Sequence, residues 1–195
     1  MGGLVSLFVN GLINYGFTAL FTPIIYHFGW SYAVLSLAFS LRTMEAGIAA
    51  PIIGIIADKI GPRKVTFIGV FVTGLGVILL SRVDSLVMFY LAFIMISIGL
   101  SGCAGHVQMI AVANWFRKNA GKAIGLLSMG IGAGGLLVPM VIWLIAQYNW
   151  QTTLVILGVG MWIVCLPLSL VVRHKPEQYG YLPDGEMFYP CLRIK

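Results

Sequence analysis

Charged residues are scarce in this sequence. Asp, Glu, Lys and Arg make up 9% of the 195 residues, hydrophobic residues make up 59%, and the mean hydropathy is +0.97. A soluble domain carries about 25% charged residues, because water must solvate its surface. The charges here are too few to cover a globule of this size. The composition therefore excludes a soluble protein and indicates that lipid surrounds most of the surface.

Reactive and metal-binding residues are also few. The three cysteines, Cys103, Cys165 and Cys191, have no disulfide or metal-ligand spacing, and the first two read as small apolar filler. No nucleophile–base arrangement is visible either. A membrane enzyme or redox subunit would need paired histidines or a cysteine cluster, and the single embedded histidine, His106, argues against it. The sequence thus predicts no enzyme, no cofactor and no metal.

The net charge of +6 does not indicate a nucleic-acid partner. The basic residues lie in short clusters between apolar runs rather than in one patch. A cleavable signal peptide is not expected, because the first apolar stretch is too long for one, lacks a basic flank and leads into more apolar runs.

Apolar stretches long enough to cross a bilayer, about 20 residues each, recur along the chain. They are solid apolar runs rather than alternating ones, which favours helices over a barrel. The predicted fold is an all-α membrane protein of six transmembrane helices within residues 1–172, with a tail at 173–195. The expected spans are 3–28, 31–57, 65–82, 85–113, 121–147 and 150–172.

The positions of Lys and Arg predict the orientation. With Arg42 left out because it falls inside a span, one side carries 10 basic residues and the other carries only Arg82. The excess marks the cytoplasmic side, so both termini are expected in the cytoplasm of a multi-pass plasma-membrane protein. The ten are Lys59, Arg63, Lys64, Arg117, Lys118, Lys122, Arg173, Lys175, Arg193 and Lys195.

The connection between the second and third spans carries a motif. It reads Gly54-Ile-Ile-Ala-Asp58-Lys59-Ile-Gly61-Pro62-Arg63-Lys64. This resembles the signature G-x-L-a-D-r-x-G-r-r of the major facilitator superfamily, in the loop where that family carries it. A solvated turn that only obeys the positive-inside rule is the alternative. The resemblance implies a loop that latches two halves of a transporter, so we assign Gly54, Asp58, Lys59, Gly61, Arg63 and Lys64 to gating.

Two further stretches resemble monocarboxylate and oxalate–formate type carriers of that superfamily. One is Trp115-Phe116-Arg117-Lys118 with the glycines and Pro139 that follow, and the other is Phe28-Gly29-Trp30-Ser31. The tail from Pro176 to Gly185 is similar to the start of the central loop in such prokaryotic carriers. There are departures, because Asn119 and Ala120 replace further basic residues and Met95 stands where many proton antiporters have an arginine. Proton antiport of drugs is therefore the less favoured mode.

The resemblance implies the N-terminal half of a secondary carrier, built as a 3+3 inverted repeat. Such a carrier would move a small organic solute, a carboxylate by this resemblance, by alternating access. A proton or another ion would be its coupling partner, and a second six-helix half would complete it. The second half would be a missing part, another chain or a second copy. A non-transporting fragment or an assembling membrane subunit is the alternative, and an interrupted reading frame would produce the ending at 187–195.

Two charges, Arg42 and Glu45, lie deep inside the second span. A charge at the bilayer centre costs about 2.5–3.5 kcal/mol on insertion scales, so such groups face a partner or a water-filled cavity. They are three residues apart and share a helix face, so they can neutralise each other. Either they form a structural ion pair, or Arg42 attracts an anionic substrate while Glu45 exchanges a proton or competes for the arginine.

The remaining polar candidates are weaker. His106 could relay protons, with a simple interhelical hydrogen bond as the alternative. Asn10, Asn14, Tyr15 and Thr18 repeat at helical spacing and could line a pathway or bond between helices. Small-residue spacing predicts close helix packing at Gly125, Gly130, Gly134 and Gly135, and also at Gly99, Gly102 and Gly105.

Overall fold

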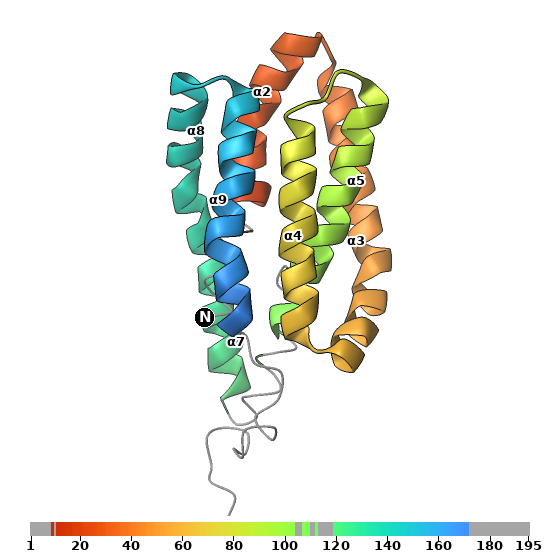
Figure 1. The fold of residues 1–195 in the computed structure, drawn as a ribbon, viewed down its shortest axis with the longest axis vertical. Helices are drawn as coiled ribbons and strands as arrows, with labels where there is room; N and C mark the ends of the chain where they lie inside the picture. The colour runs from red at the N-terminus through yellow and green to blue at the C-terminus, as the bar shows by residue number, and fades with distance from the viewer. Residues whose placement is uncertain (1–8, 10, 104–106, 110–111, 113–118, 172–195) are drawn as a thin grey trace, which may run out of the picture.

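The protein folds as a bundle of nearly parallel and antiparallel helices (Figure 1). A computed structural model describes residues 9, 11–103, 107–109, 112 and 119–171. The described part contains helices and turns and no strand, so the expected all-α architecture is confirmed. The elements are η1 (Gly11–Tyr15), α2 (Gly16–Phe28), α3 (Tyr32–Ile60), α4 (Pro62–Leu80), α5 (Leu86–Cys103), α7 (Ala120–Ala133), η2 (Gly134–Leu137), α8 (Val138–Gln147) and α9 (Trp150–Val171).

Five of these segments are long and apolar enough to cross a membrane within the described residues. They are α3, α4, the segment that contains α5, the segment from α7 to α8, and α9. Six spans were expected. The predicted first span, 3–28, is described as one turn of π-helix, η1, followed by the 13 residues of α2, and most of its residues before Gly11 lie outside the described part.

The predicted span 121–147 is not one continuous α-helix. The 3-10 turn η2 separates α7 from α8. Gly134 and Gly135 are poor helix formers, and Pro139 has no N–H with which to bond the carbonyl of Gly135 four residues earlier. The helix therefore tightens at this point rather than running straight through.

Two glycines make the sharpest turns. Gly29 ends α2 in the left-handed conformation with φ 66°, and its N–H donates to the Ile25 carbonyl at 2.8 Å. Gly61 has φ 96° and is the only residue between α3 and α4. A residue with a Cβ would be strained at either position. The turn at Gly61 therefore explains why the motif between the second and third spans requires a glycine there.

Helix α4 lies between α5 and α9 and packs closely on both (Figure 1). A Cβ added to Gly69 of α4 would lie 2.7 Å from the carbonyl oxygen of Gly99 in α5. On the other side, a Cβ at Gly158 of α9 would lie 3.2 Å from the carbonyl oxygen of Gly74. Small residues thus let backbones touch in lipid, where no hydrophobic effect draws helices together.

We expect Gly99→Ala to destabilise the protein by about 1–3 kcal/mol, because the new methyl group overpacks the interface between α4 and α5. An ideal Cβ there would lie 2.6 Å from the Thr73 backbone nitrogen and 2.9 Å from the Gly69 carbonyl oxygen. The matched control is Gly125→Ala in α7, where a Cβ would meet no atom within 4 Å. Thermal unfolding of the purified chain in detergent measures both. Equal melting temperatures would contradict the packing shown here.

An aromatic core joins α2, α3 and α5. Phe17 of α2 meets Phe93 of α5 edge to face, with 4.8 Å between ring centroids, and lies 6.0 Å from Phe39 of α3. Edge-to-face contacts of this kind add about 0.5–1.5 kcal/mol to the burial of the rings. This core fixes the upper half of α3 against its neighbours, and the next turn of α3 carries Arg42.

Candidate functional site

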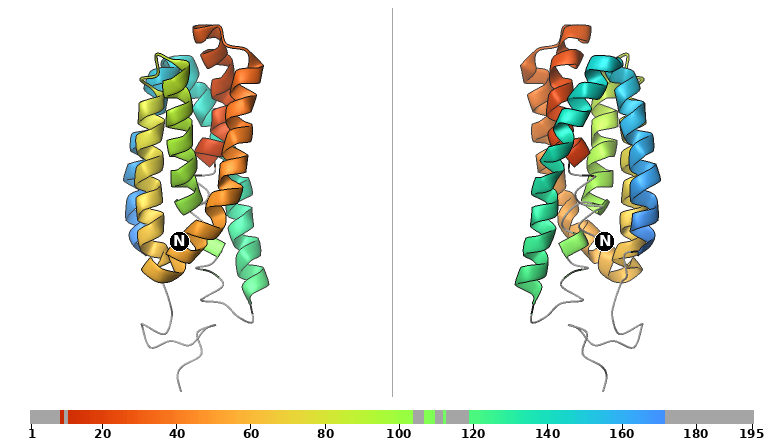
Figure 2. Two further views of the ribbon diagram at one scale, coloured as in Figure 1. Left: turned by 90° about the vertical axis from the view of Figure 1, so that its right-hand side faces the viewer. Right: turned by 90° about the vertical axis from the view of Figure 1, so that its left-hand side faces the viewer.

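Helix α3 carries two of its four charged residues, Arg42 and Glu45, near mid-length. It is 29 residues long, so at about 1.5 Å per residue Arg42 lies roughly 15 Å from the Tyr32 end and Glu45 lies close to the centre. The helix contains Pro51 and changes direction toward its Ile60 end (Figure 2). Both charges therefore lie between apolar stretches of α3, away from either end of the helix.

The guanidinium of Arg42 contacts both a neighbouring helix and its own helix. Its Nη2 donates a hydrogen bond to Oδ1 of Asn14 in η1. Its guanidinium also lies over the ring of Phe39, 5.4 Å from the centroid, a distance at which the ring quadrupole attracts a cation. One polar side chain of the first span thus contacts the cation of the second. The sequence identified Asn14 and Arg42 separately but not their contact.

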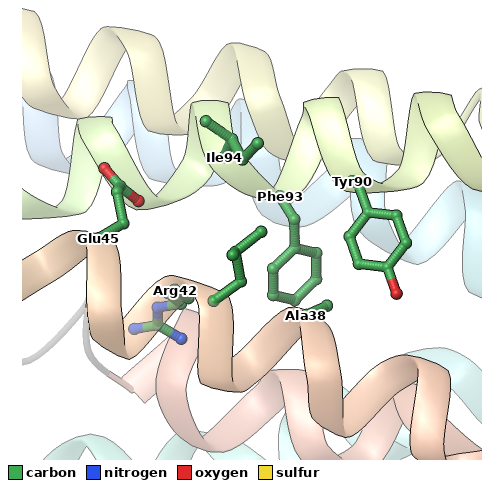
Figure 3. A pocket seen from close by; sticks show the side chains of 7 residues that line it. Ala38, Arg42, Glu45, Tyr90, Phe93 and Ile94 are labelled. Carbon is green, nitrogen blue, oxygen red and sulfur yellow. The ribbon is translucent and has the colours of Figure 1, made fainter.

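Glu45 has no such partner. Both carboxylate oxygens are buried, and neither has a hydrogen bond within the part of the chain that the structure describes. Figure 3 shows the side chains of Arg42 and Glu45 leaving α3 in different directions, the first toward η1 and the second toward α5. The two residues share a helix face, but their expected mutual neutralisation is not a direct contact in the described structure.

Two cavities meet at Glu45. A small one of about 10 Å³, which has room for one water molecule, is lined by Arg42, Glu45, Tyr90, Phe93 and neighbouring apolar residues (Figure 3). A larger groove of about 400 Å³ continues along α3 past Ile48 and Ile52. Glu45 is the one polar residue that lines both. The site therefore combines a bonded cation, a free carboxylate and open volume near the middle of the bundle.

The other polar candidates do not join this pair directly. Tyr15 is exposed, and its carbonyl accepts a hydrogen bond of 2.6 Å from the Thr18 hydroxyl. His106 and Asn10 lie outside the described residues. Gln108 is buried and donates to the Thr66 hydroxyl at 3.3 Å, which links the segment after α5 to α4. Gln108 thus links two helices. Thr18 instead bonds a backbone carbonyl of its own turn.

The motif residues surround the turn at Gly61. Asp58 and Lys59 lie in the last turn of α3, Arg63 and Lys64 lie in the first turn of α4, and all four are exposed. A Cβ added to Gly54, the first residue of the motif, would meet no atom within 4 Å in this chain. An exposed cluster with both signs of charge at a one-residue turn is well suited to contact another segment at the membrane surface.

The glycine predictions need one correction. Gly99 and Gly102 pack closely against α4, but at Gly125 and Gly135 an added Cβ would meet nothing within 4 Å. Helical spacing shows that glycines share a face and does not show that a neighbour occupies it. The prediction from spacing also did not include Gly69, Gly74 and Gly76 of α4 or Gly158 of α9. These glycines lie where α4 packs against α5 and α9. In the described part, no group of three metal-ligating residues comes together.

Comparison with known proteins points to one family. The family model of the Major Facilitator Superfamily matches residues 3–187. An "Uncharacterized 38 kDa protein in 23S RNA operon" of Thermoproteus tenax is 29% identical over 181 residues, which are 93% of this chain and 48% of that protein. A "Probable nitrate transporter NarT" of Staphylococcus aureus is 28% identical over 168 residues, which are 85% of this chain and 43% of that protein. The chain thus spans about half the length of these curated relatives.

Proposed function

Because this chain belongs to the major facilitator superfamily, we propose that it forms one six-helix half of a secondary carrier for a small oxyanion. The carrier works by alternating access, with its solute site near the middle of the membrane. The observation that carries the proposal is Arg42, a cation held by Asn14 beside a cavity near the centre of α3.

The chemistry of Arg42 favours an anion. A cation inside the bilayer is expensive and is kept where it binds a counter-charge or a solute. The guanidinium presents a planar fork of N–H donors, which matches two oxygens of a planar oxyanion. Nitrate and a carboxylate share this planar shape and single negative charge. The Staphylococcus aureus relatives support nitrate as the first candidate, and the resemblance to monocarboxylate carriers supports a small carboxylate as the second.

A second half is part of the proposal. The relatives are about twice as long as the matched region, and carriers of this family have their site between two six-helix halves. In this chain, Met44 and Ile48 are exposed along the groove beside Glu45, by 67% and 61%. A second half would cover this side of the site. A proton is the coupling ion that the neighbouring carboxylate suggests.

Ligand-dependent stabilisation of the purified chain tests the anion class. Arg42, Asn14 and Glu45 all belong to this chain, so the contacts on which the proposal rests are present in it. Nitrate or formate at 100 times its dissociation constant should raise the unfolding free energy by about 2.7 kcal/mol, whereas choline should leave the melting temperature unchanged. The anion with the lower dissociation constant identifies the substrate class. Absence of any shift with nitrate and with formate would refute the proposal.

We expect the two ends of the bundle to face opposite sides of the membrane. The end that holds Gly61 and Ala120 carries Lys59, Arg63, Lys64 and Lys122, whereas the other end carries Arg82 (Figure 1). By the positive-inside rule the first end is cytoplasmic. Single cysteines at positions 119 and 149, in a background without the native cysteines, should label from the inside and from the outside respectively. Labelling of position 149 only from the inside would overturn the topology.

A further inference from the structure

The hydrogen bond between Asn14 and Arg42 joins the first two spans at the candidate site. Asn14 lies in η1 and is half-buried, and its Oδ1 accepts from Nη2 of Arg42 on α3. A cation inside the bilayer is kept beside an acceptor, and the carboxylate of Glu45, three residues along the same helix, is within reach of Arg42 by spacing. A neutral side chain from another helix holds the guanidinium instead.

The turn that carries Asn14 is held by packing on two sides. Ile13, the preceding residue, is 5% exposed and belongs to the apolar core that also contains Phe17 and Leu20. The same turn, η1, packs against η2, the 3-10 turn between α7 and α8. Single turns of π-helix of this kind are found frequently at functional sites. Contacts to the core and to η2 thus limit how far the amide of Asn14 can move.

Asn14 orients the guanidinium of Arg42 without cancelling its charge. A guanidinium carries five N–H donors, so one bond to Asn14 leaves donors for a two-point contact with a planar oxyanion. The centroid of the Phe39 ring lies 5.4 Å from Cζ of Arg42, and the ring attracts the cation. Glu45 leaves α3 toward α5 and has no hydrogen bond with Arg42 among the described residues (Figure 3). The cation is therefore fixed in direction while its charge stays available.

From this arrangement we propose that Asn14 is a positioning residue for the anion, because its neutral amide holds the Arg42 guanidinium in one orientation and away from Glu45. This inference rests on the proposed function and adds a residue of the first span to its site. Without the amide, the guanidinium is released to pair with Glu45, since residues three apart on a helix can meet. With a carboxylate in place of the amide, the guanidinium would stay bonded but its charge would be neutralised. A neutral acceptor orients the cation and also leaves its charge to the solute.

Asn14→Asp separates a positioning role from a merely structural one. Melting temperatures of the purified chain over a range of nitrate concentrations give both the stability of the free protein and the dissociation constant for nitrate. We expect the free variant to melt no lower than the wild type, because a carboxylate still bonds the guanidinium. We expect its dissociation constant for nitrate to rise by at least about tenfold, because juxtaposed like charges oppose binding. A residue that served stability alone would leave the dissociation constant unchanged.

Two further variants vary the amide without adding a charge. Asn14→Leu removes the acceptor and keeps a side chain of similar size, so nitrate should bind about tenfold more weakly once the guanidinium is no longer oriented. Asn14→Gln keeps a neutral amide on a longer stem and should bind nitrate more tightly than Asn14→Leu. Thr18→Val is the matched control on the same span, because the exposed Thr18 hydroxyl bonds the Tyr15 carbonyl. It should leave the dissociation constant for nitrate unchanged.

The outcomes separate the two proposals. If Asn14→Asp and Asn14→Leu bind nitrate as tightly as the wild type, the role of Asn14 is overturned and the anion site on Arg42 still stands. If neither nitrate nor formate binds the wild type, the anion site fails and the inference fails with it. Should Asn14→Asp not fold, Asn14→Leu and Asn14→Gln decide, and equal dissociation constants for these two variants would overturn the inference.

Discussion

Arg42→Ala is expected to reduce anion uptake by about tenfold to a hundredfold in membrane vesicles that hold the assembled carrier, while the protein still reaches the membrane. The guanidinium is the cation of the site, bonded to Asn14 and placed over Phe39. Hydrogen bonds to a charged group contribute about 1.5–3 kcal/mol, which corresponds to that range of affinity. Labelled nitrate or formate uptake measures the effect, and Thr43→Ala is the control on the same helix.

Two companion variants separate a substrate role from a structural one. Arg42→Lys keeps the charge but loses the planar fork, so it should retain part of the uptake. Arg42→Ala also leaves Glu45 without a nearby positive charge, which by itself could harm the protein. The double variant Arg42→Ala/Glu45→Ala removes that charge as well. We expect it to stay inactive, and full recovery of uptake would show that Arg42 serves only the structure.

The second prediction with a large expected effect concerns solute uptake by this chain as a monomer. Purified protein that is demonstrably monomeric in liposomes is expected to take up no more solute than protein-free liposomes. The groove beside Glu45 opens along α3, where Met44 and Ile48 are exposed, so a single half leaves the site facing lipid instead of water on alternating sides. Oligomeric state must be measured in the same preparation. Robust uptake by a monomer would refute the half-carrier proposal, whereas uptake by a dimer would identify a second copy as the other half.

The helical architecture could be predicted from composition because lipid leaves the backbone few choices. A spanning segment must satisfy its own hydrogen bonds, so solid apolar runs such as 32–60 and 150–171 become helices. The break at Gly134–Leu137 was missed, although Gly134, Gly135 and Pro139 were visible in the sequence. Local propensity alone does not decide whether a helix tightens or continues, since packing against neighbouring helices also contributes.

Only the position of the site along the chain could be predicted from the sequence, and its contacts could not. The depth of Arg42 and Glu45 follows from counting residues along α3, and a spacing of three puts both on one face. Which neighbours they meet depends on how helices pack, and a sequence pattern does not contain that information. Arg42 extends to Asn14, and Glu45 points toward α5 instead of pairing with Arg42. The glycines show the same limit of a sequence pattern. Both Gly99 and Gly125 have helical small-residue spacing, but only Gly99 has a close neighbour on another helix of this chain.

Nuclear magnetic resonance of the Arg42 guanidinium during an anion titration tests the central claim most directly. In protein labelled with nitrogen-15 in its arginine side chains, Arg42→Lys assigns the Arg42 signal by its loss. We predict that nitrate or formate shifts this signal saturably and with the same dissociation constant as ligand-dependent stabilisation gives, while the exposed Arg63 and Arg82 do not respond in this way. Saturable anion binding that leaves the Arg42 signal unmoved would contradict a carrier site built on this arginine.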